Sequence, residues 1–175
     1  VKKSLDTYRA AYVEYSPVVH QSGASTLRDN TAAYLDYVAE AGKQDVDILV
    51  FPEYGLTGYD SSSRAAWVSG GWTENVPAPP PSGERLIPCD DTSKFSDAPS
   101  IVALSCAARQ HKVAVVVNLV TYDSGRDMYN TDVALDTDGT MTRLGQAATG
   151  RERGGSVSEP PAAAAAARSS GASRG

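Results

Sequence analysis

Two helices are predicted by apolar side chains that recur every three or four residues along the chain. The first ends at Gly42, and Thr26 followed three residues later by Asp29 predicts its cap. The second runs from about Ala98 to His111, with Pro99 in its first turn, where proline is favoured. The side chains expected to face inward are Leu27, Thr31, Tyr34, Val38 and Ala41 in the first helix, and Ile101, Leu104 and Ala108 in the second.

Four segments have the composition of strands. Ile48–Phe51 and Val113–Val120 are almost uninterrupted apolar runs, which is typical of strands covered on both faces. Thr7–Tyr15 is rich in aromatic residues, and Asn130–Leu135 alternates between polar and apolar positions before a turn at 137–139. Because buried strands alternate with helices, the sequence predicts an α/β layered fold.

Composition and charge exclude several classes of protein. The 175 residues are enough for one domain, and 41% hydrophobic with 21% charged residues is typical of a soluble globular chain. No apolar run approaches the roughly 20 residues that a transmembrane helix needs. The net charge of −5 argues against nucleic acid as a partner, because phosphate binding needs a basic surface. Two cysteines and two histidines are too few for a zinc ribbon or an iron–sulfur site.

The composition changes after residue 142. Residues 143–175 contain five arginines and two glutamates, a net charge of +3, so residues 1–142 carry −8 of the total of −5. The segment has no aromatic side chain and buries too little apolar surface to offset the entropy of ordering it. We therefore predict a domain over residues 4–142 and a disordered tail over 143–175. An RNA-binding arm is the alternative, although such arms use aromatic side chains to stack on bases.

One carboxylate lies where α/β sheets bind their ligands. Glu53 directly follows the apolar run Ile48–Phe51, in the string FPEYGLTGY. Pro52 cannot donate a ladder hydrogen bond and should end the strand, and two glycines allow the backbone to turn sharply afterwards. A carboxylate buried at the carboxyl end of a central strand suits a general base. The spacing leaves open that Glu53 instead caps a helix or pairs with an arginine.

The string FPEYGLTGY resembles the signature around the catalytic glutamate of the carbon–nitrogen hydrolase (nitrilase) superfamily. Three more segments, Asp6–Val18, Ile87–Leu119 and Tyr129–Gly139, resemble the vanin and biotinidase branch of that superfamily in the same order. The resemblance implies a four-layer α-β-β-α sandwich, of which this chain would hold the N-terminal part. It implies hydrolysis of a small-molecule amide such as pantetheine by a glutamate base, a lysine and a cysteine nucleophile, without a cofactor.

Within that triad, only the glutamate has a counterpart in this sequence. Glu53 matches the base, but no lysine follows Lys112 and no cysteine follows Cys106, whereas the family has both after the region of Met141. Amide hydrolysis needs a nucleophile beside the base and a group that stabilises the oxyanion. We therefore expect the chain as written to be an inactive part of a vanin-like hydrolase. Without the rest of the sandwich, its apolar strands should leave it unstable or molten.

The resemblance also covers Cys89 and Cys106 and implies a disulfide between them in an extracellular protein. Two unpaired thiols are the alternative, since no signal peptide is visible before Val1. Neither cysteine suits the missing nucleophile. Cys106 lies inside a predicted helix, and the acidic side chains of Asp90 and Asp91 follow Cys89.

Four other side chains have open roles. His20 and His111 lie near the ends of predicted elements, without neighbours at metal-ligand spacing, and are expected to be exposed to solvent. Trp67 and Trp72 lie in residues 61–94, which the sequence predicts to be a long irregular connection. Since this connection follows Glu53, the two tryptophans either line a substrate cleft or pack the connection onto the domain.

Overall fold

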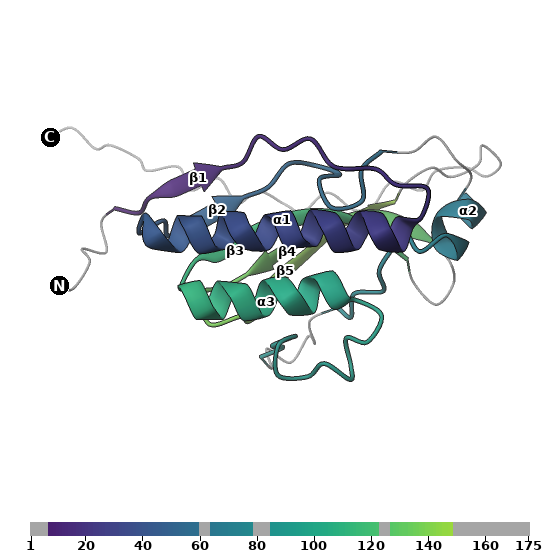
Figure 1. Ribbon diagram of the computed structural model, residues 1–175. Helices are drawn as coiled ribbons and strands as arrows, with labels where there is room; N and C mark the ends of the chain where they lie inside the picture. The colour runs from purple at the N-terminus through teal and green to yellow at the C-terminus, as the bar shows by residue number, and fades with distance from the viewer. Residues whose placement is uncertain (1–6, 60–63, 79–84, 123–126, 149–175) are drawn as a thin grey trace, which may run out of the picture.

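The structure is a computed structural model that describes residues 7–59, 64–78, 85–122 and 127–148 (Figure 1). It contains a five-stranded sheet, two long helices and one short helix. In chain order these elements are β1 (Ala10–Tyr12), α1 (Gly23–Lys43), β2 (Ile48–Val50), α2 (Arg64–Ser69), α3 (Pro99–His111), β3 (Ala114–Tyr122), β4 (Met128–Leu135) and β5 (Met141–Ala148).

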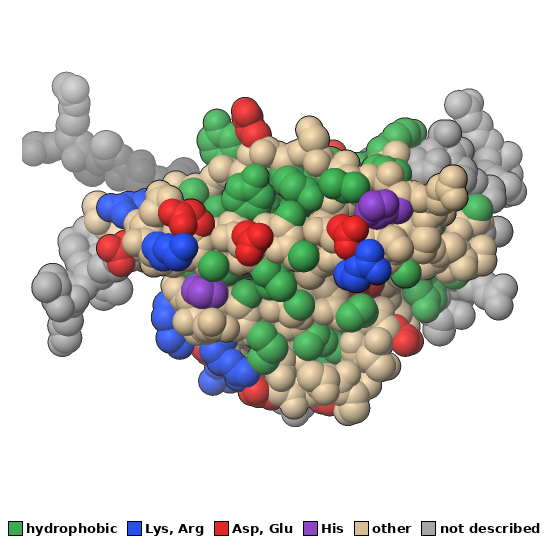
Figure 2. All heavy atoms as spheres, viewed as in Figure 1, with side chains coloured by type: hydrophobic (Ala, Val, Ile, Leu, Met, Phe, Trp, Pro, Cys, Tyr) green, Lys and Arg blue, Asp and Glu red, His purple; other side chains and the backbone are tan. Residues whose placement is uncertain are grey.

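The strands lie in the sheet in their chain order, β1-β2-β3-β4-β5. The pairs β1–β2 and β2–β3 are parallel, and the pairs β3–β4 and β4–β5 are antiparallel. Helices α1 and α3 lie side by side in front of the sheet, on the same face (Figure 1). Figure 2 shows the outer surface of this helix layer, where charged side chains are scattered among apolar ones. The predicted α/β fold class is confirmed.

The two predicted helices form, with a different start for the first. Every residue predicted to face inward in α1 is buried. However, α1 begins at Gly23, and its N-cap Ser22 makes no side-chain capping bond, so the predicted cap is wrong. The Thr26 hydroxyl instead donates to the Ser22 carbonyl inside the first turn, and Asp29 pairs with His20 and Arg28. Thr26 therefore bonds within the first turn of α1, because the helix starts before the cap that the sequence predicted.

The strands differ from their predictions mainly in length. The predicted strand Thr7–Tyr15 is reduced to Ala10–Tyr12, because β1 is an edge strand whose neighbour β2 is itself three residues long. Before β1, the Arg9 amide donates to the side chain of Asp47 rather than extending a ladder. In the connection predicted to be irregular, α2 forms a short helix and Glu74 pairs with Thr121 beside β3. The sequence pattern thus located the two long helices and four of the strands, but it missed α2 and β5 and the ends of β1.

The chain remains in the sheet beyond the predicted domain end at residue 142. Residues 143–148 continue β5, which pairs with β4 from Met141 to Ala148, so this part of the predicted tail is strand. The remainder of that prediction, residues 149–175, lies outside the described residues. Among the helices that the structure describes, each is too short or too polar to span a membrane.

The sheet has one closed face and one open face. On the closed face, β3 and β4 bury alternate apolar side chains completely or almost completely beneath the helices: Val115, Val117, Leu119, Val133 and Leu135. The intervening residue Val116 is only partly buried, and Val50 of β2 is 38% exposed. The prediction that β2 and β3 are covered on both faces is therefore wrong for the described residues.

Candidate functional site

Glu53 lies in a tight turn at the carboxyl end of β2. The strand ends at Val50, and the amide of the next residue, Phe51, still donates to the Val116 carbonyl of β3 at 2.9 Å. Tyr54, which directly follows Glu53, has a left-handed backbone conformation with φ of 56°, which is uncommon for a residue with a side chain. Its amide donates to the side-chain oxygen of Asn118 at 2.7 Å. This contact holds the backbone beside Glu53 in a conformation that it would not favour alone.

Gly55 allows this turn to pack directly against α1. A Cβ atom at Gly55 would lie 1.8 Å from the hydroxyl oxygen of Tyr34, so any other residue would force the helix or the turn to move. The Tyr34 ring stacks on Phe51 with 3.7 Å between ring centroids, and burial raises the pKa of its hydroxyl. The close approach of Tyr34 thus requires a glycine at position 55. This contact also fixes the turn against α1 on the closed side of the sheet.

A network of amide side chains on the open face orients the carboxylate. The Asn118 side-chain nitrogen donates to the side-chain oxygens of Asn130 at 2.6 Å and Asp132 at 2.9 Å. The Asn130 nitrogen in turn donates to Glu53 Oε1 at 2.5 Å. Because Asn118 accepts from the Tyr54 amide, its oxygen and nitrogen ends have different partners. The network therefore connects the central strand β3 to both Glu53 and the backbone that carries it.

The carboxylate of Glu53 faces an open hollow rather than a closed cleft. The hollow has a volume of about 500 Å³. It is lined by Val50, Phe51, Glu53, Val116, Asn118, Asn130, Asp132 and Gly145. The side chain of Glu53 is exposed, so the burial expected for a general base is not provided by the described residues. Its observed partner is Asn130, rather than the helix end or the arginine that the sequence left open.

The two tryptophans pack beside this hollow. Trp67 and Trp72 are 5% and 6% exposed, and their ring centroids are 5.9 Å apart. They form a second apolar cluster with Val120 and Met128, against which Tyr54 packs. Of the two roles considered for them, packing of the connection onto the sheet is the one observed. The cluster covers one end of the otherwise open face.

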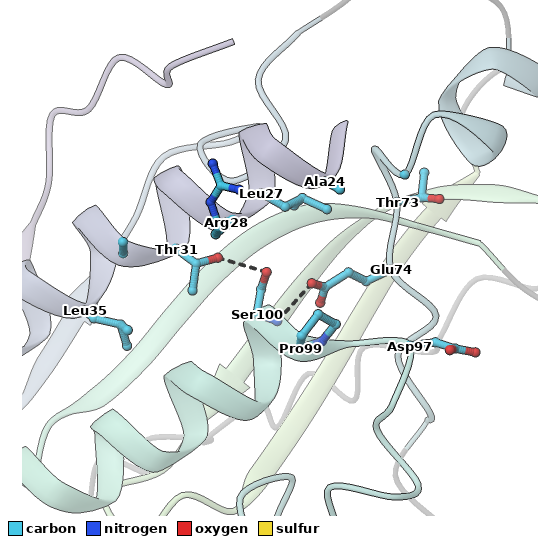
Figure 3. Close-up of a pocket in the computed structure, with 12 residues that line it drawn as sticks. Ala24, Leu27, Arg28, Thr31, Leu35, Thr73, Glu74, Asp97, Pro99 and Ser100 are labelled. Atoms are coloured by element: carbon cyan, nitrogen blue, oxygen red, sulfur yellow. Dashed lines mark hydrogen bonds between the residues drawn. The ribbon is translucent and has the colours of Figure 1, made fainter. Parts of the chain in front are cut away.

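A second carboxylate is buried on the helix side of the molecule. Glu74 is 2% exposed and lines a pocket of about 430 Å³ between α1 and the start of α3 (Figure 3). Its Oε1 accepts from the Ser100 amide at 2.9 Å, and the Ser100 hydroxyl accepts from Thr31. Oε2 has no hydrogen-bond partner. Burial raises the pKa of Glu74 to about 7, although bonds from Ser100 and the Ile101 amide favour the charged form.

The remaining predicted residues lie away from the Glu53 hollow. Cys89 and Cys106 form a disulfide with 5.0 Å between their Cα atoms, which ties the 87–91 turn to α3. His20 is exposed and hydrogen-bonded to Asp29, and His111 is partly exposed. The expectation that the histidines are exposed is therefore confirmed for His20, whereas His111 is only partly exposed.

Four polar residues of these two sites are not predicted from the sequence: Asn118, Asn130, Asp132 and Glu74. A signal for Asn118 is present, since it is the one polar residue within the apolar run VAVVVNLV. Asn130 and Asp132 have the spacing of two residues that places side chains on the same face of a strand. Glu74 lies in a connection without periodicity, and nothing in its sequence context indicates burial.

Comparison with known proteins agrees with this arrangement. The sequence profile of the carbon-nitrogen hydrolase family matches residues 9–153. The chain belongs to the carbon–nitrogen hydrolase family. It is 30% identical to pantetheinase from Sus scrofa over 159 residues, covering 79% of this chain and 30% of that protein. It is 27% identical to biotinidase from Homo sapiens over 135 residues, covering 71% of this chain and 24% of that protein.

Solved structures of the nitrilase superfamily share the fold of this carbon–nitrogen hydrolase chain. Nit3 from Saccharomyces cerevisiae, a member of branch 10 of the superfamily, aligns with a TM-score of 0.56 at 18% identity, covering 78% of this chain and 42% of that one. An amidase from Nesterenkonia sp. aligns with a TM-score of 0.54 at 20% identity. The chain spans about 30% of the length of the pantetheinases that it matches.

Proposed function

We propose that this chain supplies the glutamate base of a pantetheinase-type amide hydrolase and that it is inactive by itself. The observation that carries the proposal is the position of Glu53, hydrogen-bonded by Asn130 in an open hollow at the end of a parallel strand. The similarity to pantetheinases and biotinidase gives the substrate class, a small molecule with a linear amide bond. Another amidase activity of the same family is the closest alternative.

The arrangement supports a base more than a complete catalytic site. A carboxylate held by a fixed amide donor can accept a proton from a nucleophile without first reorganising. However, a hydrolase that forms a covalent intermediate also needs the nucleophile and a donor for the oxyanion. In this family these are a cysteine and a lysine, and no lysine follows Lys112 and no cysteine follows Cys106 in the sequence.

A non-catalytic binding or regulatory role is the second candidate. The exposure of Glu53 favours it, because the open hollow and its hydrogen-bonding side chains can hold a small molecule without a reaction. Binding of pantetheine to the purified chain without turnover would support this role. Turnover by the purified chain would exclude it.

Pantetheine hydrolysis by the purified chain tests the proposed inactivity. We expect no release of cysteamine above the buffer rate. Turnover that disappears in Glu53→Gln would contradict the inactivity and would still support Glu53 as the base.

A chimera tests the role of Glu53 separately. Residues 1–140 would be joined to the remaining part of pig pantetheinase, which supplies its own lysine and cysteine. We expect the chimera to hydrolyse pantetheine, and Glu53→Gln to lower its rate about 100-fold or more. Glu40→Gln is the matched control, because Glu40 is exposed on α1 and bonded to Gln44 and Lys43. Equal activity of the Glu53→Gln chimera would refute the assignment.

The proposal includes a domain that extends from about residue 4 through the sheet. It also places the protein in an oxidising compartment. A disulfide between partly exposed cysteines persists outside the reducing cytosol. Mass spectrometry of secreted protein under non-reducing conditions is expected to show Cys89 and Cys106 bonded. Two free thiols in that material would contradict the bond.

A further inference from the structure

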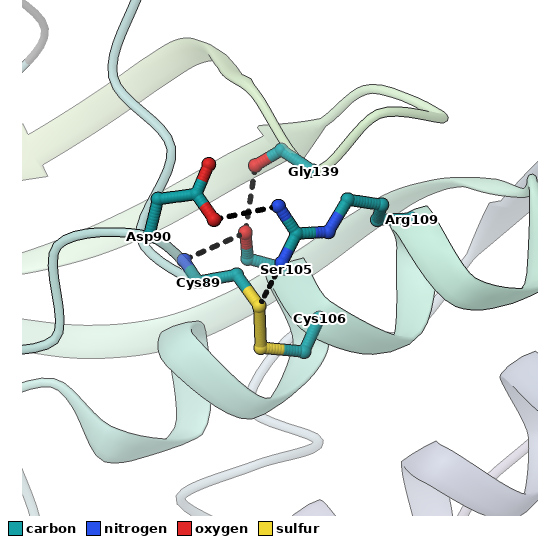
Figure 4. Close-up of a disulfide and its surroundings, with 6 residues drawn as sticks. All are labelled: Cys89, Asp90, Ser105, Cys106, Arg109 and Gly139. Carbon is teal, nitrogen blue, oxygen red and sulfur yellow. Dashed lines mark hydrogen bonds and ion pairs between the residues drawn. A yellow bond between two sulfur atoms is a disulfide. The ribbon is translucent and has the colours of Figure 1, made fainter.

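The disulfide lies beside a cation that contacts only one of its two sulfur atoms. The Arg109 guanidinium donates from Nη2 to Cys89 Sγ at 2.8 Å, and its Nη1 pairs with Asp90 at 2.7 Å (Figure 4). Cys106 comes from the middle of α3, one turn before Arg109. Both cysteines are partly exposed, so a small molecule can approach the bond.

This asymmetry affects how the bond breaks. In thiol–disulfide exchange, an attacking thiolate bonds to one sulfur and the other sulfur leaves as a thiolate. A leaving thiolate is favoured when a positive charge stabilises it. Because the guanidinium contacts Cys89, departure of Cys89 and attack on Cys106 should be the faster route.

We propose that this disulfide is an exchange site for small thiols, with Cys106 as the residue that is modified and Cys89 as the leaving group. The incoming thiolate forms a new S–S bond to Cys106 Sγ while the Cys89–Cys106 bond breaks. The bonding electron pair moves to Cys89 Sγ, which becomes a thiolate beside Arg109. The incoming sulfur is oxidised and the Cys89 sulfur is reduced, so no further reactant is needed.

The surroundings favour a reversible reaction. The Cys89 amide donates to the Ser105 hydroxyl at 3.2 Å, and that hydroxyl donates to the Gly139 carbonyl at 2.7 Å. The amides of Asp90 and Asp91 both donate to the Ile87 carbonyl. The bond to Ser105 holds the 87–91 turn on α3, and the bonds to Ile87 fix the shape of the turn, both independently of the disulfide. The Cys89 thiolate therefore stays close to Cys106 and can attack the mixed disulfide, which releases the small thiol again.

Asp90 limits the effect of Arg109. Its carboxylate pairs with the same guanidinium and places a negative charge near the leaving sulfur. Removing this charge in Asp90→Asn should increase the preference for Cys89 as leaving group. Removing the positive charge in Arg109→Gln should decrease it, whereas Arg109→Lys keeps a charge and should retain part of it.

The experiment uses the full chain with reduced glutathione as the probe. The reaction is stopped at early times with N-ethylmaleimide, and the position of the glutathione is determined by peptide mass spectrometry. We expect glutathione on Cys106 and maleimide on Cys89, with this isomer in about threefold or larger excess over the reverse one. Arg109→Gln should bring the ratio near one.

Arg28→Gln is the matched control. Arg28 is, like Arg109, an arginine bonded to a neighbouring aspartate, but it lies on α1 and contacts no sulfur. We expect this variant to keep the wild-type ratio. Glutathione mainly on Cys89, an even distribution in the wild type, no mixed disulfide, or a ratio unchanged by Arg109→Gln would each overturn the proposal.

Discussion

The two faces of the sheet are built from the same strands but have opposite character. On the face covered by α1 and α3, side chains such as Val117 and Val133 are fully buried. On the other face, the same strands present Asn118, which donates hydrogen bonds to Asn130 and Asp132. Adjacent residues of β3 thus belong to two different environments.

This difference separates what holds the fold together from what could perform chemistry. Burial of apolar area is the main stabilising contribution to folding, and it is concentrated on the closed face. The open face carries the exposed carboxylate of Glu53 and the amides that orient it. Substitutions on the closed face should therefore change stability, and substitutions on the open face should change association and the site.

The largest expected effect is the loss of stability caused by a lysine on the closed face, compared with a lysine on the open face. Val117→Lys would bury a charge without a partner, at a cost of about 4 kcal/mol or more, which is comparable to the whole stability of a small domain. We expect it to abolish the helical circular dichroism signal, which the wild-type chain should retain. Val116→Lys, one residue earlier on the partly open face, is the control and should keep the helical signal.

A second prediction concerns the behaviour of the wild-type chain. Val50 is 38% exposed and the neighbouring Val116 is only partly buried, so apolar surface lies in the open. We expect the isolated chain to be unstable or molten, to bind the dye ANS and to associate as its concentration rises. Val116→Lys should reduce this association. A cooperative calorimetric transition together with a monomeric profile on a sizing column would contradict the prediction.

The closed face could be predicted from the sequence, and the open face largely could not. Tyr34 in α1 and Leu104 in α3 each lie at helical spacing from other apolar residues of the same helix, so their burial follows from periodicity alone. Asn118 was counted within an apolar strand, and its contacts with Tyr54 and Asn130 join residues 64 and 12 positions away. Long-range polar contacts of this kind leave no local pattern. The sequence signals for the site are the motif around Glu53, the single polar residue Asn118 in an apolar run, and the two-residue spacing of Asn130 and Asp132.

A third prediction uses the pH dependence of the closed side. The pKa of Glu74 is raised by burial from 4.5 to about 7 in the folded chain. Between these two values the folded state holds a proton that the unfolded state has released. Stability should therefore be fully present below about pH 4.5 and fall, by about 3 kcal/mol in total, as the pH rises through 7.

Urea denaturation at pH 5 and pH 8 measures this loss. Glu74→Gln should remove most of the difference, because glutamine keeps the shape and cannot ionise, whereas Glu40→Gln on the exposed side of α1 should not. Arg28 and Asp97 also line the pocket around Glu74, so Asp97→Asn tests whether a neighbouring charge contributes. A stability that rises between pH 5 and pH 8 in the wild type would contradict the assigned burial.

The smallest effects should come from the amides of the open face, and they should differ from each other. Asn118 is 5% exposed, and Asn118→Ala would leave the Tyr54 amide without its partner, at a cost of about 1–2 kcal/mol. Asn130 is partly exposed, so water can replace its bond to Glu53, and Asn130→Ala should cost less than about 1 kcal/mol. Urea midpoints of the two variants measure the difference. Equal costs would mean that Asn130 stabilises the sheet itself, rather than orienting the carboxylate of Glu53.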